Sequence, residues 1–148
     1  MKQFPPLNLP PVALEVQNDK VYDSFRKKWI LLTPEEWVRQ NFLQFLVQYE
    51  NFPKGLISVE KQIQLNGLKK RYDAVVFNTK LEAKILIEFK AYNVEITQET
   101  VNQAVRYNQL FKVDYLILSN GINHFIININ YFKNSFSYVK SIKNVKLL

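Results

Sequence analysis

The chain has 148 residues and a formal net charge of +7, which favours a polyanionic partner such as nucleic acid. It contains no Cys and a single His, His124, which excludes disulfides, thiolate metal sites, a cysteine nucleophile and His-rich metal sites. No apolar run approaches the roughly 18 residues of a membrane span, and the N-terminus lacks the apolar stretch of a secretory signal, so we expect a cytoplasmic protein with no membrane partner.

A single domain spanning residues 1–148 is predicted, because domains usually hold about 100–200 residues. Residues 1–12 contain four prolines and are expected to form an extended arm, since proline removes a backbone donor and disfavours helix before it. The core is expected over about residues 20–130. Residues 131–148 carry four lysines and no acid, and form a basic C-terminal segment.

The first predicted elements are a short hairpin around residues 18–19 and a helix. Thr33 is a suitable N-cap, Pro34 suits the first helical position, and Glu36 would complete a capping box. Apolar side chains then recur with helical spacing as far as Tyr49. A Pro-containing segment follows, so the helix should end before Asn51.

The order of the following elements predicts the fold class. We expect three strands, a helix and two strands over residues 57–65, about 70–77, 85–90, 98–111, 115–119 and 122–130. Asn66-Gly67 is a strong hairpin signal between the first two strands. A strand–helix–strand crossover after an antiparallel meander predicts an α/β (α+β) fold, with a mixed sheet flanked by helices.

An acid and a base stand together at the end of the strand over residues 85–90. Glu88 and Lys90 share a face, because strand side chains alternate with a period of two. If the preceding connection turns near residues 80–81, paired residues sum to about 161, and Asp73 faces Glu88. Two facing carboxylates favour a bound cation, and Mg²⁺, with Mn²⁺ as a substitute, is the natural hard ion. Lys90 would then act on a water or on phosphate charge.

Two further groups of polar residues have weaker signals. Gln103 and Tyr107 lie four residues apart and share a helix face, so a crossover helix would present both to the strand end. Lys69, Lys70 and Arg71 form a basic cluster, for which phosphate binding and plain solvation are both open.

Together these residues resemble the PD-(D/E)xK nuclease pattern in its variant with a QxxxY third motif. Over about residues 20–130 the chain is similar to the N-terminal nuclease domain of type I restriction enzyme R subunits, although the sequence contains no Walker motif or helicase motor. The matching segments are Thr33–Gln40, Lys70–Asp73, Glu88–Lys90, Gln103–Asn108 and Ser119–Gly121. The resemblance implies a restriction-endonuclease-like core of order αβββαβ and a Mg²⁺-dependent DNA endonuclease that hydrolyses phosphodiester bonds.

The resemblance also implies roles for individual residues. Asp73, Glu88 and the Phe89 carbonyl would hold Mg²⁺, and Lys90 would orient a water and stabilise the transition state. The residues expected to position the DNA are Gln103, Tyr107 and Arg106, and those expected to add sequence-independent affinity are Lys69, Lys70 and Arg71.

The first helix offers two acids for the site, since related nucleases place an acid of this helix near the metal. Glu35 lies near the apolar stripe of the helix, whereas Glu36 points away and has the capping role, so Glu35 is favoured and Glu36 is the alternative. For Glu60, a place at the border of the site and a role as a solvated glutamate are both open, and the second is favoured.

The alternative function is a catalytically weak, nuclease-like DNA-binding module that acts with partner proteins. The expected partners are DNA and either a second copy of the chain or proteins of a restriction or repair system.

Overall fold

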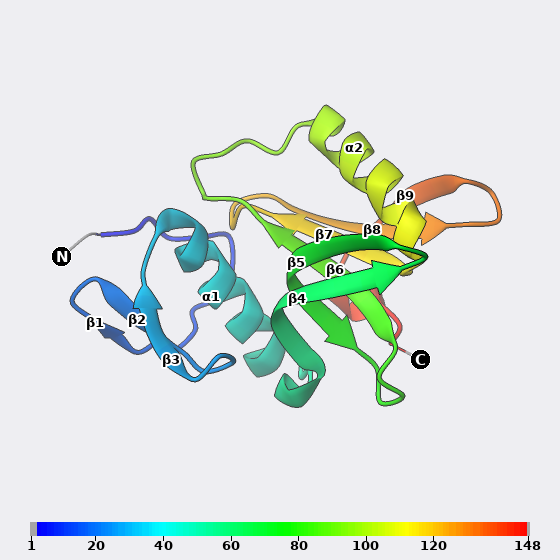
Figure 1. The fold of residues 1–148 in the computed structure, drawn as a ribbon. Coiled ribbons are helices and arrows are strands. Elements are labelled where there is room, and N and C mark those ends of the chain that lie inside the picture. Colours follow the sequence, from blue (N-terminus) through cyan, green and yellow to red (C-terminus); the bar gives the residue numbers. More distant parts are fainter. Residues whose placement is uncertain (1–2, 148) are drawn as a thin grey trace.

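A six-stranded mixed sheet lies between the two α-helices of residues 3–147, the part of the chain that the computed structural model describes (Figure 1). Its strands, in spatial order, are β4 (Ile57–Leu65), β5 (Leu68–Phe77), β6 (Ala83–Phe89), β7 (Tyr115–Ser119), β8 (His124–Asn130) and β9 (Ser135–Val139). The β6–β7 pair is parallel and the other neighbours are antiparallel. The predicted mixed sheet with flanking helices is therefore confirmed.

The helix α1 (Pro34–Gln48) covers one face of the sheet, and its start agrees with the prediction. The Thr33 side chain accepts a hydrogen bond from the Glu36 backbone N–H at 3.1 Å. The apolar side chains that α1 buries against the sheet are Val38, Phe42, Leu43 and Leu46. After the helix, Asn51 adopts a left-handed conformation and the chain turns toward β4.

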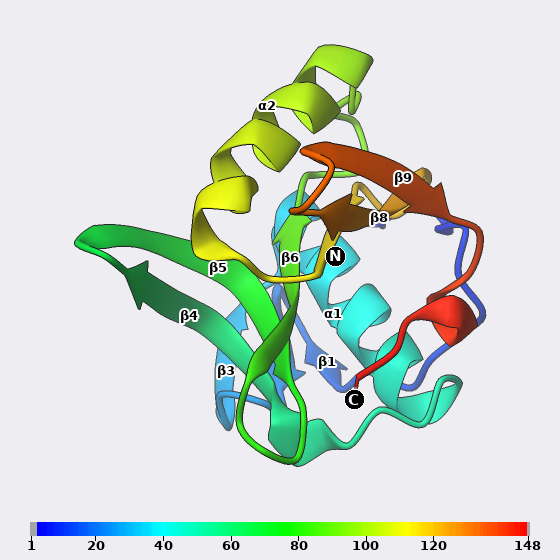
Figure 2. The same cartoon turned by 90° about the vertical axis from the view of Figure 1, so that its right-hand side faces the viewer.

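The helix α2 (Gln98–Asn108) covers the opposite face of the sheet (Figure 2). It is shorter than the predicted span of residues 98–111. Residues 109–111 form the 3₁₀ turn η2 (Gln109–Phe111), which ends at Lys112 with a left-handed φ of 54°. The Tyr72 hydroxyl of β5 donates a hydrogen bond to the Asn108 side chain at the end of α2, which connects the crossover helix to this strand.

Other predicted boundaries also need correction. β8 begins at His124 rather than at residue 122, because the Asn120 side chain accepts hydrogen bonds from the backbone N–H groups of Ile122 and Asn123 and holds a turn there. β9 lies within the segment described only as basic. A second, three-stranded sheet was predicted only in part. The hairpin of β1 (Val16–Gln17) and β2 (Lys20–Asp23) agrees with the prediction. The third strand, β3 (Lys28–Leu31), was not predicted, because it begins in a basic segment.

The proline-rich arm lies along the domain between α1 and the β7–β8 turn. Phe4 stacks on Trp37 of α1 with ring centroids 5.4 Å apart, and the Trp37 indole N–H donates to the Pro5 carbonyl. The Asn8 backbone N–H donates to the Gly121 carbonyl at 2.8 Å. Within the described residues, no helix is long and apolar enough to cross a membrane.

Gly121 is a specific point of stability, because it has a φ of 84° and touches both the arm and α1. A Cβ at this position would lie 2.8 Å from a Leu7 methyl carbon and 3.2 Å from one of Val38. We expect Gly121→Ala to destabilise the protein by about 1–3 kcal/mol through backbone strain and overpacking. Urea unfolding monitored by tryptophan fluorescence would measure this change.

Gly55→Ala is the matched control, since a Cβ there meets no atom within 4 Å and the residue has no positive φ. This control should stabilise slightly, by about 0.4–1 kcal/mol, through the unfolded state. Equal effects of the two substitutions would show that the close contact at Gly121 contributes nothing.

Candidate active site

The register of β5 and β6 brings two carboxylates together. Ala74 pairs with Ile87 and Val75 with Leu86, so partner numbers sum to 161 as predicted, and the next position along the ladder sets Asp73 opposite Glu88. The Asp73 carboxylate also accepts a hydrogen bond from the Phe89 backbone N–H, with Oδ2 2.6 Å from the nitrogen. Asp73 is therefore fixed to the end of β6 beside Glu88.

A third carboxylate continues this row onto the edge strand β4. Val59 pairs with Ala74 and Lys61 with Tyr72, which leaves Glu60 level with Asp73. Glu60 has a left-handed φ of 54° and interrupts the regular ladder. Side-chain alternation in β5 is also broken at this point. Tyr72 and Ala74 are two residues apart and would normally share a face, but they pack into cores on opposite sides of the sheet.

Glu88 is partly buried and paired with a lysine. Burial raises the pKa of the Glu88 carboxyl, the nearby Lys70 ammonium opposes this rise, and the charge of Asp73 adds to it. The Lys70 Nζ lies 2.9 Å from the Glu88 Oε1 and also sits over the rings of Tyr72 and Tyr107, at 4.7 and 5.1 Å from their centroids. The structure therefore places Lys70 beside Glu88, whereas the sequence grouped it with a basic surface cluster.

Arg39 of α1 is the main residue of the site that was not predicted. Its guanidinium is buried, with 7% of the side chain exposed, and lies 3.2 Å from the Asp73 carboxylate. The other carboxylates within ion-pair distance belong to Glu35, Glu36 and Glu60, at 3.5, 3.6 and 3.4 Å. One cation thus links the first helix to β4 and β5.

The preference for Glu35 over Glu36 rested on an orientation that is wrong. Glu36 was expected to point away, but its side chain is 11% exposed against 49% for Glu35. Its Oε1 accepts hydrogen bonds from Arg26 and Gln40, each at 2.8 Å. The reason is a second buried face of α1, formed by Glu36, Arg39 and Gln40 at helical spacing, against the turn after β2.

Glu60 was expected to be a solvated glutamate, but its side chain, which is 38% exposed, is held by three guanidinium groups. Its carboxylate pairs with Arg39, with Arg26 at 3.3 Å and with Arg71 at 3.0 Å. Burial alone would raise the pKa of Glu60, but the guanidinium groups of Arg26 and Arg39 outweigh burial and lower it. Arg71, predicted to contact nucleic acid, is therefore already paired with an acid.

Lys90 lies one residue beyond β6 and is exposed. Its backbone N–H donates to the Ser119 carbonyl at 2.9 Å, which fixes the main chain at the end of the strand. Its side chain forms no ion pair with any of residues 3–147. The ammonium group is thus free, on a fixed backbone, two residues from Glu88.

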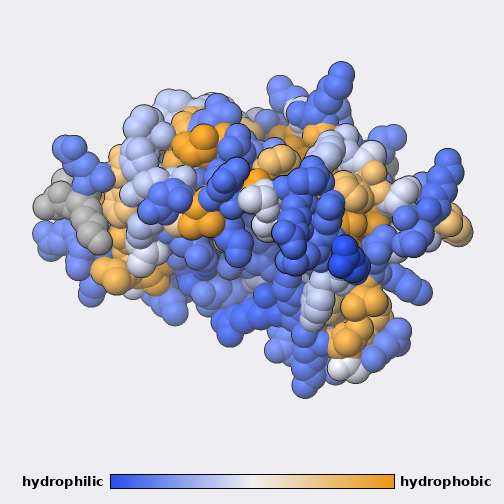
Figure 3. Space-filling view, turned by 90° about the horizontal axis from the view of Figure 1, so that it is seen from above, coloured by the Kyte–Doolittle hydropathy of each residue, from blue (hydrophilic) through white to orange (hydrophobic). Residues whose placement is uncertain are grey.

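The predicted residues of α2 divide into two groups. Tyr107 reaches the site through Lys70, whereas Gln103 contacts Glu99 of its own helix at 3.5 Å. Gln103, Tyr107 and Arg106 line an open hollow on the outer surface of α2. Seen from the α2 side, the molecule is mostly hydrophilic, with separate small apolar areas (Figure 3). Lys69 is exposed at the start of β5.

The donor set at Asp73 and Glu88 fits a hydrated magnesium ion. Among residues 3–147, no group of three or more His, Cys, Asp or Glu side chains is arranged to enclose a metal. Mg²⁺ usually takes only one or two protein carboxylates and completes its octahedron with water and substrate phosphate. Asp73 and Glu88 would supply two such carboxylates, and the Phe89 carbonyl is a further candidate oxygen ligand.

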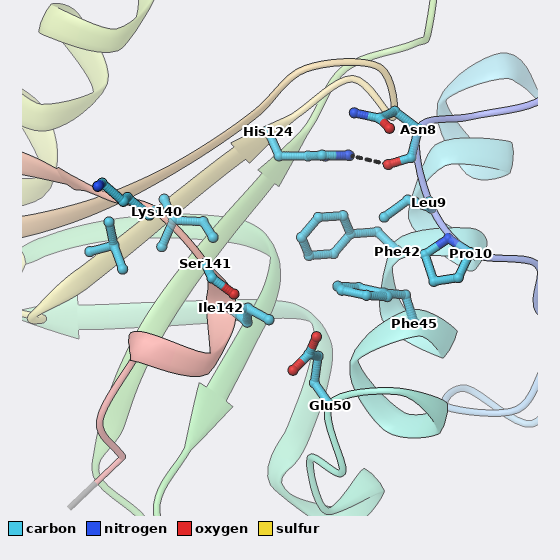
Figure 4. A pocket seen from close by; sticks show the side chains of 12 residues that line it. Asn8, Leu9, Pro10, Phe42, Phe45, Glu50, His124, Lys140, Ser141 and Ile142 are labelled. Atoms are coloured by element: carbon cyan, nitrogen blue, oxygen red, sulfur yellow. Dashed lines mark hydrogen bonds between the residues drawn. The ribbon is translucent and has the colours of Figure 1, made fainter.

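A separate pocket of about 260 Å³ lies on the α1 side of the sheet, beneath the arm (Figure 4). His124 borders it and lies 2.9 Å from the Asn8 carbonyl through Nε2 and 2.6 Å from the Ser119 hydroxyl through Nδ1. Burial lowers the pKa of His124, and the hydrogen bond to Asn8 opposes this change. Because a carbonyl oxygen only accepts, the His124 Nε2–H is the donor to the arm. His124 therefore anchors the arm and lies apart from the paired carboxylates.

Comparison with known proteins identifies the family of the chain. Residues 34–142 match the family described as the type I restriction enzyme R protein N terminus (HSDR_N). The match runs from the first residue of α1 through β9 and includes Asp73, Glu88 and Arg39. A comparison with curated proteins gives no match.

The opposite pKa shifts of Glu88 and Glu60 predict opposite effects on stability. A carboxyl whose folded pKa is raised destabilises the fold above its unfolded pKa, whereas one whose folded pKa is lowered stabilises it there. Glu88→Gln should therefore increase the free energy of unfolding at pH 7 without metal, and Glu60→Gln should decrease it. The Glu88 effect should fade as the pH falls from the raised folded pKa to the unfolded value of about 4.3, whereas the Glu60 effect should fade only below about 4.3, as the pH falls through the lowered folded pKa. Urea titrations at pH 7 and pH 3.5 would measure them, and a destabilising Glu88→Gln at pH 7 would contradict the argument.

Proposed function

Because the chain belongs to the family of type I restriction enzyme R protein N termini, we propose that it is a Mg²⁺-dependent DNA endonuclease of the restriction-endonuclease-like type. The observation that carries this proposal is the β5–β6 register, which sets Asp73 beside Glu88 with Lys90 two residues further on. This spacing matches the chemical needs of phosphodiester hydrolysis: two oxygen ligands for a divalent ion and one cation next to them.

Asp73 and Glu88 would hold Mg²⁺, with the Phe89 carbonyl as a further ligand. The ion, when bound, supplies Lewis acidity toward the phosphate and lowers the pKa of a bound water. The Phe89 N–H and the Arg39 guanidinium hold the Asp73 carboxylate in place before the ion arrives. This preorganisation reduces the reorganisation required during the reaction.

Lys90 would orient the attacking water and stabilise the negative charge that develops on the phosphate. Its free ammonium and its anchored backbone support this role. Tyr107 and Arg106 of α2 would position the DNA strand, and Gln103 would contribute from the same surface. Glu36, through Arg39, is a positioning residue for Asp73, and Glu35 lies at the outer edge of the same network.

The proposed partner is DNA, together with further proteins of a restriction system. The family name supports both, since restriction enzymes act on DNA and an R protein is one component of a larger enzyme. The alternative function is a DNA-binding module that does not cleave DNA.

The test compares plasmid nicking with calorimetric Mg²⁺ titration in four proteins. The wild type should bind Mg²⁺ and nick DNA. Asp73→Asn and Glu88→Gln should lose both properties, because each removes a charged ligand while keeping the side-chain shape. Lys90→Ala should bind Mg²⁺ normally but nick at least about 100-fold more slowly, since it removes only the stabilising cation. Wild-type nicking by Lys90→Ala would overturn the assignment, and DNA binding without nicking in any buffer would select the alternative.

Salt dependence tests the basic cluster. Each lysine that touches a phosphate contributes about one unit to the slope of log K against log salt. Lys69→Gln should reduce the slope by about one unit, because Lys69 is exposed, whereas Arg71→Gln should reduce it less, because Glu60 already neutralises Arg71. Fluorescence anisotropy of a labelled duplex in Ca²⁺ would measure both, and an unchanged slope for Lys69→Gln would assign that residue to solvation alone.

A further inference from the structure

We propose that Lys70 is an internal counter-cation, which occupies the Glu88 carboxylate in the metal-free protein and transfers to a DNA phosphate when Mg²⁺ takes its place. This inference rests on the proposed function and assigns the regulation of the same site. It makes metal loading and DNA binding mutually dependent.

The position of Lys70 is defined by three elements of the site. From β5 its ammonium contacts the Glu88 carboxylate of β6 at 2.9 Å. The same nitrogen lies over the Tyr72 ring of β5 and the Tyr107 ring of α2. An ammonium between two aromatic faces is favoured electrostatically. Lys70 is therefore seated in the site rather than extended from the surface.

The two paired carboxylates explain why a cation is needed there without metal. Glu88 is partly buried and faces the negative charge of Asp73, so an uncompensated charge would be costly. Lys70 meets this need with a single positive charge. A divalent ion at the same carboxylate would lie within a few ångström of the ammonium and repel it strongly, so the two compete for Glu88.

Lys70 is able to leave, whereas Arg39 is not. The Arg39 side chain is 7% exposed and has four carboxylates around it, but the Lys70 side chain is 29% exposed and has one. A lysine is also a flexible point charge, in contrast to a planar guanidinium. The β4–β5 hairpin extends outward beside α2 (Figure 2), so a displaced Lys70 would enter solvent on that side of the molecule.

A DNA phosphate near the site would provide the new partner for Lys70. Tyr107, which contacts the ammonium, is 40% exposed, so DNA on α2 would approach Lys70 directly. When Lys70 leaves Glu88, the carboxylate becomes available as a ligand for Mg²⁺. When Mg²⁺ binds the carboxylate, the Lys70 ammonium becomes available for a DNA phosphate. By linkage, DNA and metal then raise each other's affinity by the same factor.

The first test is calorimetric Mg²⁺ titration without DNA. Lys70→Gln should bind Mg²⁺ about tenfold more tightly than the wild type, because the competing charge is gone. Lys70→Arg keeps the charge and should stay within about twofold of the wild type. Lys61→Gln removes an exposed charge from the neighbouring strand and controls for general electrostatics, so it should also change little. Lys70→Met, which keeps an apolar stem against the rings, replaces Lys70→Gln if circular dichroism shows that the latter is unfolded.

The second test repeats the titration with Ca²⁺, with and without a duplex oligonucleotide, to avoid cleavage. Duplex DNA should tighten Ca²⁺ binding to the wild type about fivefold or more, and this coupling should be weaker in Lys70→Gln, in which only the direct contact between the ion and the phosphate remains. Two results would overturn the inference. One is unchanged or weaker metal binding in both Lys70→Gln and Lys70→Met, and the other is an equal effect of DNA on Ca²⁺ affinity in the wild type and in Lys70→Gln.

Mg²⁺ titration of Glu88→Gln distinguishes a wrong role for Lys70 from a wrong proposed function. If Glu88→Gln loses metal binding while Lys70→Gln gains none, the metal site stands and only the role of Lys70 falls. If wild type and Glu88→Gln bind Mg²⁺ equally, or neither binds it, both proposals fall together.

Discussion

One buried guanidinium connects the parts of this site that the chain supplies from distant positions. Arg39 lies on α1, yet it reaches carboxylates of its own helix, of β4 and of β5. Removing one partner from such a buried group generally costs several kcal/mol, because the remaining charge stays desolvated. The position of the first helix and the orientation of Asp73 are therefore set by the same interaction.

The distribution of charge follows from this arrangement. The protein carries a net charge of +7, yet Glu60, Asp73 and Glu88 lie level with one another on three adjacent strands. The chain compensates these acids from within, with Arg26, Arg39 and Arg71 near one end of the row and Lys70 near the other. Part of the positive charge that indicates a nucleic-acid partner is thus used to stabilise the fold. A count of charges overstates the surface available to DNA.

Local patterns were sufficient to predict the order of the core elements from α1 to β8 and the β5–β6 register. Strand alternation and the short β5–β6 connection define a pairing with few alternatives, and the Thr33 cap fixes the start of α1. The same rules failed where tertiary contacts override them. The left-handed backbone of Glu60 reverses the alternation of side chains between the two sheet faces, and no local sequence pattern predicts this conformation.

The burial of Arg39 and Glu36 was not predicted, for a related reason. Acid–base pairs three or four residues apart are common on exposed helix surfaces, so the pattern did not indicate burial. The useful signal was the polar stripe of Glu36, Arg39 and Gln40 adjoining an apolar stripe, which left little of α1 for solvent. Only the packing of the segment around Asp23 and Arg26 against this stripe reveals it.

The irregularity at Glu60 also affects how copies of the chain meet. β4 is an edge strand of the six-stranded sheet, and its outer backbone groups are available for pairing with another strand. A left-handed residue in mid-strand, followed by the exposed Lys61, interrupts that edge after three residues. Continuous sheet extension across β4 is therefore disfavoured. The residue that shapes the acidic row also protects the protein from open-ended self-association.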